Sequence, residues 1–260
     1  MSVNQSPHTS VLIGNHVDVR GVGDQLLLTG VIREVAEKWP GIDITVKSNG
    51  DHTIFKNNPY IMKLEEGLIP NSIDVGTGHY IQQKCRHFGI ENPKIKGDIH
   101  FDEFELEAGR RTLEQLSGNR PTIILCANST DPRKDWTTEN WERVVSILNS
   151  KYDVYQIEER VLYCWQGPDI RVLPTIRGAK QDLRTLSLRR AMAVMANSKK
   201  HLGIDTAFMH IAAALDNDCF IYWCTRLKDR IPYWGYPQHK IFLEEDKIED
   251  VITRIEKDWL

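Results

Sequence analysis

The chain has 260 residues, of which 41% are hydrophobic and 27% are charged, and its formal net charge is −3. These values are typical of a soluble globular protein with one large domain or two small ones. The nearly balanced charge argues against a protein that binds nucleic acid non-specifically by neutralising phosphates.

The first half of the chain alternates strand and helix patterns. Its predicted elements are a strand at 10–17, a helix at 25–38, a strand at 42–46, and helices at 79–88 and 104–116. Pro40 and Gly41 end the first helix, because neither residue continues a helix readily. Turn-forming residues at 117–121 mark the best domain boundary in the chain.

The second half opens with a strongly apolar strand and alternates in the same way. Its predicted elements are strands at 122–127, 153–157, 170–173, 200–204 and 219–224, and helices at 138–149, 183–197, 206–215 and 247–259. This alternation predicts an α/β fold in which helices cover both faces of parallel sheets. We therefore expect two Rossmann-like domains, residues 1–117 and 118–260, facing each other across a cleft, with the last helix packing back on the first domain.

The cysteines and the apolar runs indicate the compartment. The spacing of the five cysteines matches neither a Cys-x-x-Cys pair nor a zinc knuckle, and several lie in apolar runs, as buried free thiols do. There is no charged-then-apolar leader, and no run approaches the ~18 apolar residues of a membrane span. We therefore expect a soluble protein of the reducing cytoplasm that holds no metal.

The most informative stretch runs from Leu202 to Leu215, where a short apolar strand leads directly into an alanine-rich helix. Asp205 is in position to cap this helix, which Thr206 or Ala207 begins, by accepting hydrogen bonds from its first amides. The same amides, with the helix dipole behind them, form a natural site for an anion. The pattern indicates phosphate binding, and an ordinary strand-to-helix turn is the alternative.

A glycine-bearing turn with Gly21, Gly23 and Asp24 joins the first strand to the first helix. Glycine permits a tight turn and close approach of the backbone, and Asp24 would point from the helix start into the cleft. A helix N-cap is the structural alternative for Asp24. With Asp43 downstream, the two glycines also resemble a dinucleotide fingerprint, although Leu26 stands in place of the third glycine. A nicotinamide-dependent oxidoreductase is therefore an alternative hypothesis.

A polar loop at 127–136 follows the first strand of the second half. Ser129 and Thr130 could donate hydrogen bonds to phosphate oxygens, and Lys134 or Arg133 could neutralise their charge. A solvated loop above two packed tryptophans is the alternative.

Together, these segments resemble glycosyltransferase family 9, the ADP-heptose:lipopolysaccharide heptosyltransferases. The segments are the opening from Gly23 and Asp24 to Val46, the Lys134-Asp-Trp136 and Glu139-Asn-Trp141 pair, and Asp205-Thr-Ala-Phe-Met-His210-Ile-Ala-Ala-Ala214. Their order and approximate spacing agree with the family over roughly residues 10–245. Ala207 departs from the family's usual glycine, and the chain is short between about residues 58 and 120.

The resemblance implies a GT-B architecture with a shortened, acceptor-side first domain and a second domain that binds a nucleotide sugar. It also implies an inverting, metal-independent transfer of a sugar, heptose being the first candidate, from a nucleotide-diphosphate donor to an acceptor hydroxyl. Asp24 would be the general base. The donor-binding residues would be Ser129, Thr130, Lys134, Asp205, Thr206, Ala207 and His210, and the acceptor-side residues Gly23, Gln25 and His79.

Several points stay open at the level of sequence. The acceptor could be a lipopolysaccharide core sugar, another glycan, a protein hydroxyl or a modified nucleobase. A catalytically inactive nucleotide-sugar-binding or interaction protein of the same fold is a second hypothesis, motivated by the shortened first half. His210 and His79 could equally be structural histidines, and the aromatic residues at 222–236 are expected mainly to pack. No strong nucleic-acid or membrane-docking signal is present.

Overall fold

The computed structural model describes residues 10–14, 21–49, 52–69, 77–159, 161–163 and 170–260. The chain divides into two compact units. The first unit comprises Met1–Phe101 and Pro232–Tyr236, and the second comprises Asp102–Ile231 and Pro237–Leu260. The predicted boundary at residue 117 therefore differs from the observed grouping, which assigns the helix before it to the second unit.

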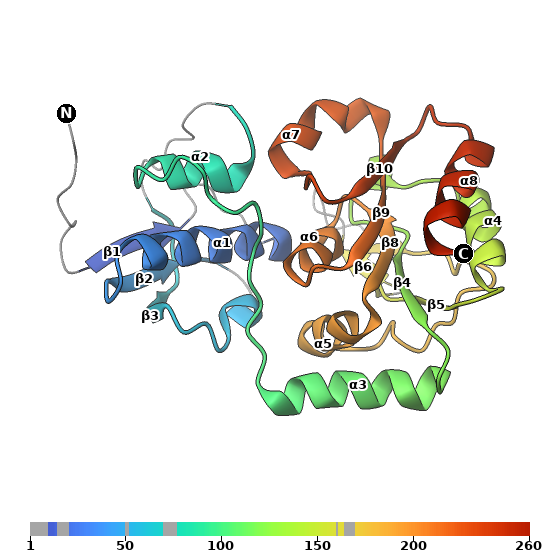
Figure 1. The fold of residues 1–260 in the computed structure, drawn as a ribbon, viewed down its shortest axis with the longest axis horizontal. Helices are drawn as coiled ribbons and strands as arrows, with labels where there is room; N and C mark the ends of the chain where they lie inside the picture. Colours follow the sequence, from blue (N-terminus) through green and yellow to red (C-terminus); the bar gives the residue numbers. More distant parts are fainter. Residues whose placement is uncertain (1–9, 15–20, 50–51, 70–76, 160, 164–169) are drawn as a thin grey trace. The chain divides into compact units, whose positions relative to one another are not determined.

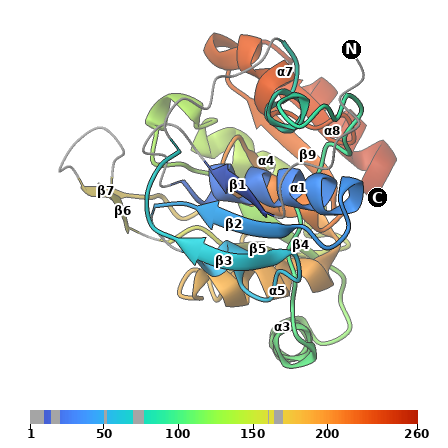
Figure 2. The same cartoon turned by 90° about the vertical axis from the view of Figure 1, so that its left-hand side faces the viewer.

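The first unit is built on a three-stranded parallel sheet in the order β1-β2-β3 (Figure 2). Its elements are β1 (Ser10–Gly14), α1 (Val22–Lys38), β2 (Asp43–Lys47), the 3₁₀ turn η1 (His52–Phe55), β3 (Ile61–Glu65) and α2 (Tyr80–Arg86). Helix α1 is buried over most of its circumference, and Leu26, Leu27 and Ile32 are fully buried. It is the core helix of this unit.

Polar side chains of α1 fix the segment that follows α2. The Arg33 guanidinium donates to the Asp98 carboxylate at 2.6 Å and to the carbonyl of Lys96 at 3.1 Å. The Thr29 hydroxyl accepts from the amide of Asp98 at 2.7 Å. At Gly30 an added Cβ would lie 2.4 Å from the carbonyl oxygen of Lys96, so the close approach of the two segments requires glycine.

The second unit contains a five-stranded parallel sheet in the order β10-β9-β8-β4-β5. Its strands are β4 (Thr122–Cys126), β5 (Asp153–Gln156), β8 (Lys200–Ile204), β9 (Asp218–Trp223) and β10 (Lys240–Leu243). The chain passes from β4 outward to β5 and then returns to β8 on the other side of β4. The strand order therefore reverses between β4 and β8, and ligands of open α/β sheets commonly bind outside the carboxyl ends of the strands at such a point.

Helices cover both faces of this sheet (Figure 1). Helices α4 (Thr138–Leu148) and α8 (Ile248–Trp259) pack on one face, and α5 (Leu188–Ser198) and α6 (Ala207–Ala214) on the other. The Trp259 ring of α8 contacts Phe220 with centroids 4.9 Å apart, and its indole N–H donates to Asp218 at 2.7 Å. The structure thus places the last helix in the core of the second unit.

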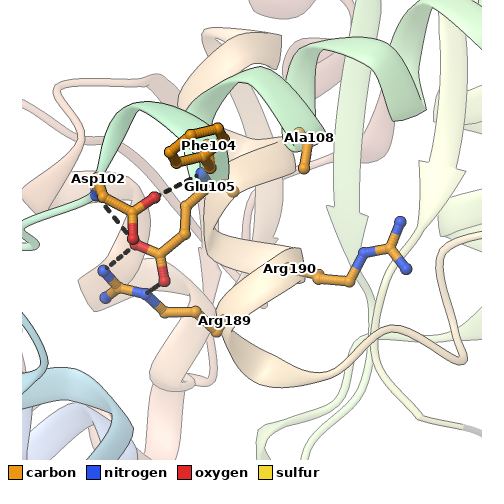
Figure 3. A pocket seen from close by; sticks show the side chains of 8 residues that line it. Asp102, Phe104, Glu105, Ala108, Arg189 and Arg190 are labelled. Atoms are coloured by element: carbon orange, nitrogen blue, oxygen red, sulfur yellow. Dashed lines mark hydrogen bonds and ion pairs between the residues drawn. The ribbon is translucent and has the colours of Figure 1, made fainter.

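Helix α3 (Glu103–Ser117) joins the second unit because it packs closely on α5. A Cβ at Gly109 would lie 2.4 Å from the carbonyl oxygen of Ala193, so the two backbones nearly touch. Arg189 holds Glu105 through two hydrogen bonds of 2.9 and 2.7 Å, beside a shallow pocket that Phe104 and Arg190 also line (Figure 3). None of the predicted site residues lines this pocket.

Most predicted elements are confirmed to within a few residues, with three kinds of difference. The helix expected at 183–197 begins at Leu188, after Ser187 in the N-cap position. The strand expected at 170–173 is β7 (Ile170–Val172), which pairs antiparallel with β6 (Val161–Tyr163) outside the large sheet. Elements without a counterpart in the prediction are β3, β6, β10, η1, η2 (Pro132–Lys134), η3 (Thr225–Arg230) and α7 (Ile231–Trp234). Positions 15–17 of the first predicted strand lie outside the described residues.

Two further observations bear on the sequence predictions. Cys85, Cys126, Cys219 and Cys224 are buried free thiols, and Cys164 lies outside the described residues. Within the described ranges, every helix is too short or too polar to cross a membrane.

Candidate nucleotide-sugar site

Two motifs that are 71 residues apart in sequence meet where the strand order reverses. Strands β4 and β8 are paired neighbours, so the loops after Cys126 and after Ile204 leave the same edge of the sheet. The Lys134 Nζ lies 2.7 Å from the Asp205 carboxylate and donates to the Asp205 carbonyl at 3.2 Å. The carboxyl edge of the second sheet thus carries a cation beside the start of α6.

The first turn of α6 remains open to a ligand. The helix begins at Ala207, and Thr206 occupies the N-cap position with extended backbone. Within the described residues, no side chain caps this turn, and the turn contains no acidic residue. Thr206, Ala207 and Phe208 are half-exposed, and the first amides of a helix, at the positive end of its dipole, have no partner within the helix. This is the geometry of an anion site.

The predicted capping role of Asp205 is wrong. Its carboxylate pairs with the Lys134 ammonium group instead of accepting from the amides of α6. Both side chains are shielded from water (23% of Lys134 and 10% of Asp205 is exposed), which strengthens the attraction between their charges. Asp205 therefore orients Lys134 beside the helix start.

Of the two adjacent cations in the loop, Lys134 is the one turned toward α6. Arg133 donates to both carboxylate oxygens of Asp131, at 2.8 and 2.6 Å, and its side chain is 57% exposed. Its charge is thus compensated locally at the surface. The alternative between Lys134 and Arg133 resolves in favour of Lys134 as the cation of the site.

The two hydroxyl residues of this loop differ in their surroundings. The Ser129 hydroxyl is buried, donates to the carbonyl of Asp131 at 2.8 Å and accepts from the amide of Asp131 at 2.9 Å. Ser129 therefore shapes the loop, and a hydrogen bond to phosphate would have to replace these contacts. Thr130 is half-exposed.

A row of buried histidines begins at His210, one turn into α6. Burial, with a smaller contribution from His210, lowers the pKa of His239 to about 3. Burial, with a smaller contribution from His239, also lowers the pKa of His201 in β8 to about 3. His239 and His201 are therefore neutral around neutral pH.

One residue at this edge escaped the sequence analysis. Glu158 follows β5, is 3% exposed, and accepts hydrogen bonds on Oε1 from the side chains of Asn128 at 2.9 Å and Gln156 at 2.6 Å. Its Oε2 has no hydrogen-bond partner among the described residues, and burial raises the pKa of this carboxyl group. Its signal in the sequence is its place directly after a buried strand.

In the first unit, Asp24 lies in the first turn of the helix that follows β1. The N-cap residue of α1 is Gly21, so the N-cap alternative for Asp24 is wrong. Asp24 is half-buried, and a Cβ at Gly21 would lie 2.4 Å from its Oδ2. The Asp24 carboxylate therefore folds over the helix start, and glycine at position 21 leaves room for it.

The residues expected on the acceptor side are buried. Gln25 is fully buried and donates to the carbonyl of Asn49 at 2.7 Å, and Gly23 is buried in the first turn of α1. His79 is 4% exposed and caps α2, accepting from the amide of Ile81 at 3.2 Å. Burial lowers the pKa of His79 to about 4. In this structure Gln25 and His79 make these contacts within the first unit, and their role on the acceptor side stays a prediction.

The aromatic residues at 233–236 pack on α2. Tyr80 stacks on Trp234 with ring centroids 5.6 Å apart and meets Tyr233 edge-on at 5.9 Å. Tyr236 lies 5.2 Å from the His79 ring. These rings therefore pack, as the sequence analysis expected.

Residues 75–247 of the chain match the family model described as glycosyltransferase family 9 (heptosyltransferase). The match covers the polar loop, Lys134 and the start of α6. The chain belongs to glycosyltransferase family 9. It is therefore a glycosyltransferase, and its candidate site residues in the second unit lie within the matched region.

Solved structures of the family share the fold. An Escherichia coli ADP-heptose lipopolysaccharide heptosyltransferase II is 12% identical, with 95% of this chain and 98% of that chain covered and a TM-score of 0.68. A family 9 glycosyltransferase from Veillonella parvula is 11% identical (97% and 90% covered, TM-score 0.70), and E. coli heptosyltransferase WaaC with ADP is 12% identical (96% and 97% covered, TM-score 0.64). No curated protein sequence matches the chain.

The fold also weakens the oxidoreductase hypothesis for this family 9 protein. Asp43 is the first residue of β2 and pairs with Ser10 at the amino end of the sheet. The acidic residue of a dinucleotide site must lie beyond the carboxyl end of its strand. As for metals, the described part of the chain contains no group of three or more histidine, cysteine, aspartate or glutamate residues that could hold one.

Proposed function

We propose that this family 9 glycosyltransferase binds a nucleotide-diphosphate sugar at the carboxyl edge of the second sheet and transfers the sugar to an acceptor hydroxyl. The observation that carries the proposal is the open first turn of α6 beside the Lys134–Asp205 pair. Backbone amides, the helix dipole and an ammonium group together suit a doubly charged phosphate group.

Lys134 and α6 would stabilise the leaving group. As the bond from the sugar to the diphosphate breaks, negative charge grows on the departing oxygen. The amides of Ala207 and Phe208 and the Lys134 ammonium group would neutralise it, with Asp205 keeping Lys134 in place. We propose that these fixed groups provide the positive charge that a divalent metal ion provides in other transferases.

Asp24 of the first unit would be the general base. It would accept the proton of the acceptor hydroxyl while the hydroxyl oxygen attacks the anomeric carbon from the face opposite the diphosphate. The new carbon–oxygen bond forms as the bond to the diphosphate breaks, and this single displacement inverts the anomeric carbon. The half-buried position of Asp24 in the first turn of α1 supports this role.

We propose ADP-heptose as the first donor to test. The proposal depends on the family and on the related fold of the E. coli heptosyltransferases, one of which is named for ADP-heptose while another was solved with ADP. The buried free thiols fit a reaction in the reducing cytoplasm.

Calorimetric titration with ADP, UDP, GDP and NADH tests the proposed site. We expect ADP to bind, NADH not to bind, and the affinity for ADP to persist in EDTA. Transfer from ADP-heptose to a panel of acceptors, with the anomeric configuration of the product read by NMR, tests the reaction. Binding of NADH in preference to ADP, a requirement for a divalent metal, or a retained anomeric configuration would each contradict the corresponding part.

A further inference from the structure

The β6–β7 hairpin connects β5 to the segment before α5 and forms its own two-stranded sheet. In β7, Ile170 and Val172 are 59% and 75% exposed, whereas Arg171 between them is half-buried. Strand β7 therefore buries little apolar surface. Its one inward contribution is the guanidinium group of Arg171.

This guanidinium group contacts the loop that carries Lys134. Arg171 Nη1 donates to the carbonyl of Ser129 at 2.6 Å, and Nη2 forms an ion pair with the Asp135 carboxylate. The other Asp135 oxygen accepts from the amide of Ser129 at 3.0 Å. Arg171 thus binds the carbonyl of Ser129, and Asp135 binds its amide. These contacts join the two ends of the loop, Ser129 and Asp135.

Lys134 lies inside this closed loop. It is the last residue of η2 and directly precedes Asp135, and its amide donates to the carbonyl of Asp131 at 3.0 Å. The position of its Cα therefore depends on where Asp135 is held. From that position its side chain reaches Asp205 at the start of α6.

We propose that Arg171 is a positioning residue of the donor site, which holds the 129–135 loop so that Lys134 meets the diphosphate. This inference rests on the proposed function, because it takes Lys134 to be a ligand of the diphosphate. In this proposal Arg171 contacts the loop and does not contact the substrate.

The contacts require arginine. A planar guanidinium group can bind a carbonyl and a carboxylate at the same time through separate nitrogens, whereas a lysine offers one nitrogen on a flexible stem. Only 10% of the Asp135 side chain is exposed, and burial raises the pKa of this carboxyl group despite the opposing effect of Arg171. Loss of Arg171 would leave that carboxylate without its counter-charge.

A double-mutant cycle tests the proposal, with the affinity for ADP measured by calorimetry. We expect Arg171→Lys to weaken ADP binding about tenfold when Lys134 is present, as coupled neighbouring residues commonly do. In a Lys134→Met background the same change should alter the affinity less than about twofold, because the side chain that Arg171 positions is gone. Asp135→Asn should show the same dependence on Lys134, and it serves as the second variant if Arg171→Lys does not fold.

Arg189→Lys is the matched control. It alters another half-buried arginine–carboxylate pair of the second unit, with Glu105 between α3 and α5, beside a pocket that none of the proposed donor-site residues lines (Figure 3). We expect it to lower thermal stability and to leave the affinity for ADP unchanged.

The outcomes are distinguishable. If Arg171→Lys leaves ADP binding unchanged, or weakens it equally with and without Lys134, the positioning role is overturned while the proposed function stands. If Lys134→Met binds ADP as tightly as the unaltered protein, the proposed donor site is overturned and the role of Arg171 with it.

Discussion

The starts of α1 and α6 are the same kind of element used in opposite ways. Both follow a parallel strand of a Rossmann-like sheet, and each helix N-terminus carries about half a positive charge. At α1 the chain supplies its own anion, Asp24, which folds against Gly21 in the first turn. At α6 the first turn holds no acidic residue, and the preceding Asp205 is engaged by Lys134.

This difference assigns a role to each helix start. A helix end already occupied by a carboxylate is a poor site for a second anion, because like charges repel. An open helix end beside a lysine is a good one. We therefore expect the diphosphate at α6, and at α1 the carboxylate that accepts the proton of the acceptor hydroxyl.

Replacing the carboxylate of α1 should have the largest effect. Asp24→Asn keeps the size of the side chain but removes its basicity, so we expect transfer to slow by about 10²- to 10⁴-fold. The affinity for ADP should stay unchanged, because the proposed donor site lies in the second unit. Initial rates and calorimetry on the same preparation measure the two quantities.

Asp43→Asn is the control for this variant. Asp43 is an exposed aspartate at the amino end of β2, in the same unit. It should transfer sugar at the normal rate. A normal rate in Asp24→Asn would show that another group takes the proton.

Removing the cation beside α6 should weaken binding by a smaller factor. Lys134→Met removes the charged hydrogen-bond donor that we propose for the diphosphate, and we expect ADP affinity to fall by about tenfold to a hundredfold. Arg133→Met, at the neighbouring exposed cation that pairs with Asp131, should change it little. Equal losses in the two variants would mean that only the net charge of the loop matters.

An acidic residue in the first turn of α6 should make this helix start resemble that of α1, whose first turn carries Asp24. Ala207→Asp places a carboxylate in the first turn, which should stabilise the protein by about 0.3–1 kcal/mol through the helix dipole. The same carboxylate should weaken ADP binding about tenfold by repelling the phosphates. Ala207→Asn, of similar size and uncharged, separates charge from bulk. A parallel fall in stability and affinity would point to disrupted packing instead.

The smallest expected effect concerns stability in acid. Burial holds the pKa of His79 at about 4, below the value of about 6.5 in the unfolded chain, so the unfolded state binds a proton first as the pH falls. The contribution of His79 to the free energy of unfolding is therefore present above about pH 6.5 and declines below that pH. Between pH 7 and pH 5.5, His79 alone should lower the free energy of unfolding by about 1 kcal/mol. Urea unfolding at both pH values measures this decline.

His79→Asn should reduce the acid sensitivity, since asparagine can still cap α2 without titrating. The same change at the exposed His87 controls for the loss of one histidine. An unchanged pH dependence in His79→Asn would show that His79 does not remain neutral in the folded protein.

Much of the site could be predicted because parallel α/β folds place the carboxyl ends of their strands at one edge. The resemblance to the family grouped Lys134 with Asp205 and the start of α6 as donor-binding residues, and the paired strands β4 and β8 bring their two loops to one edge although 71 residues separate Lys134 from Asp205. The alternating apolar pattern likewise located the strands that flank the site.

Other predictions depended on which of several possible partners a side chain prefers, and a sequence pattern does not rank these partners. Asp205 could have accepted from backbone amides, but a lysine from a distant loop pairs with it instead. Gln25 and His79 lie beside the glycine turn and at a helix start, yet the core buries both. The contact between Arg171 and the 129–135 loop depends on the β6–β7 hairpin, and the sequence pattern did not predict β6.

A crystal structure of the protein with ADP would test the central claim most directly. The account predicts the terminal phosphate within hydrogen-bond distance of the amides of Ala207 and Phe208 and of the Lys134 ammonium group. A nucleotide bound at the start of α1, or one whose phosphates contact neither α6 nor Lys134, would contradict it.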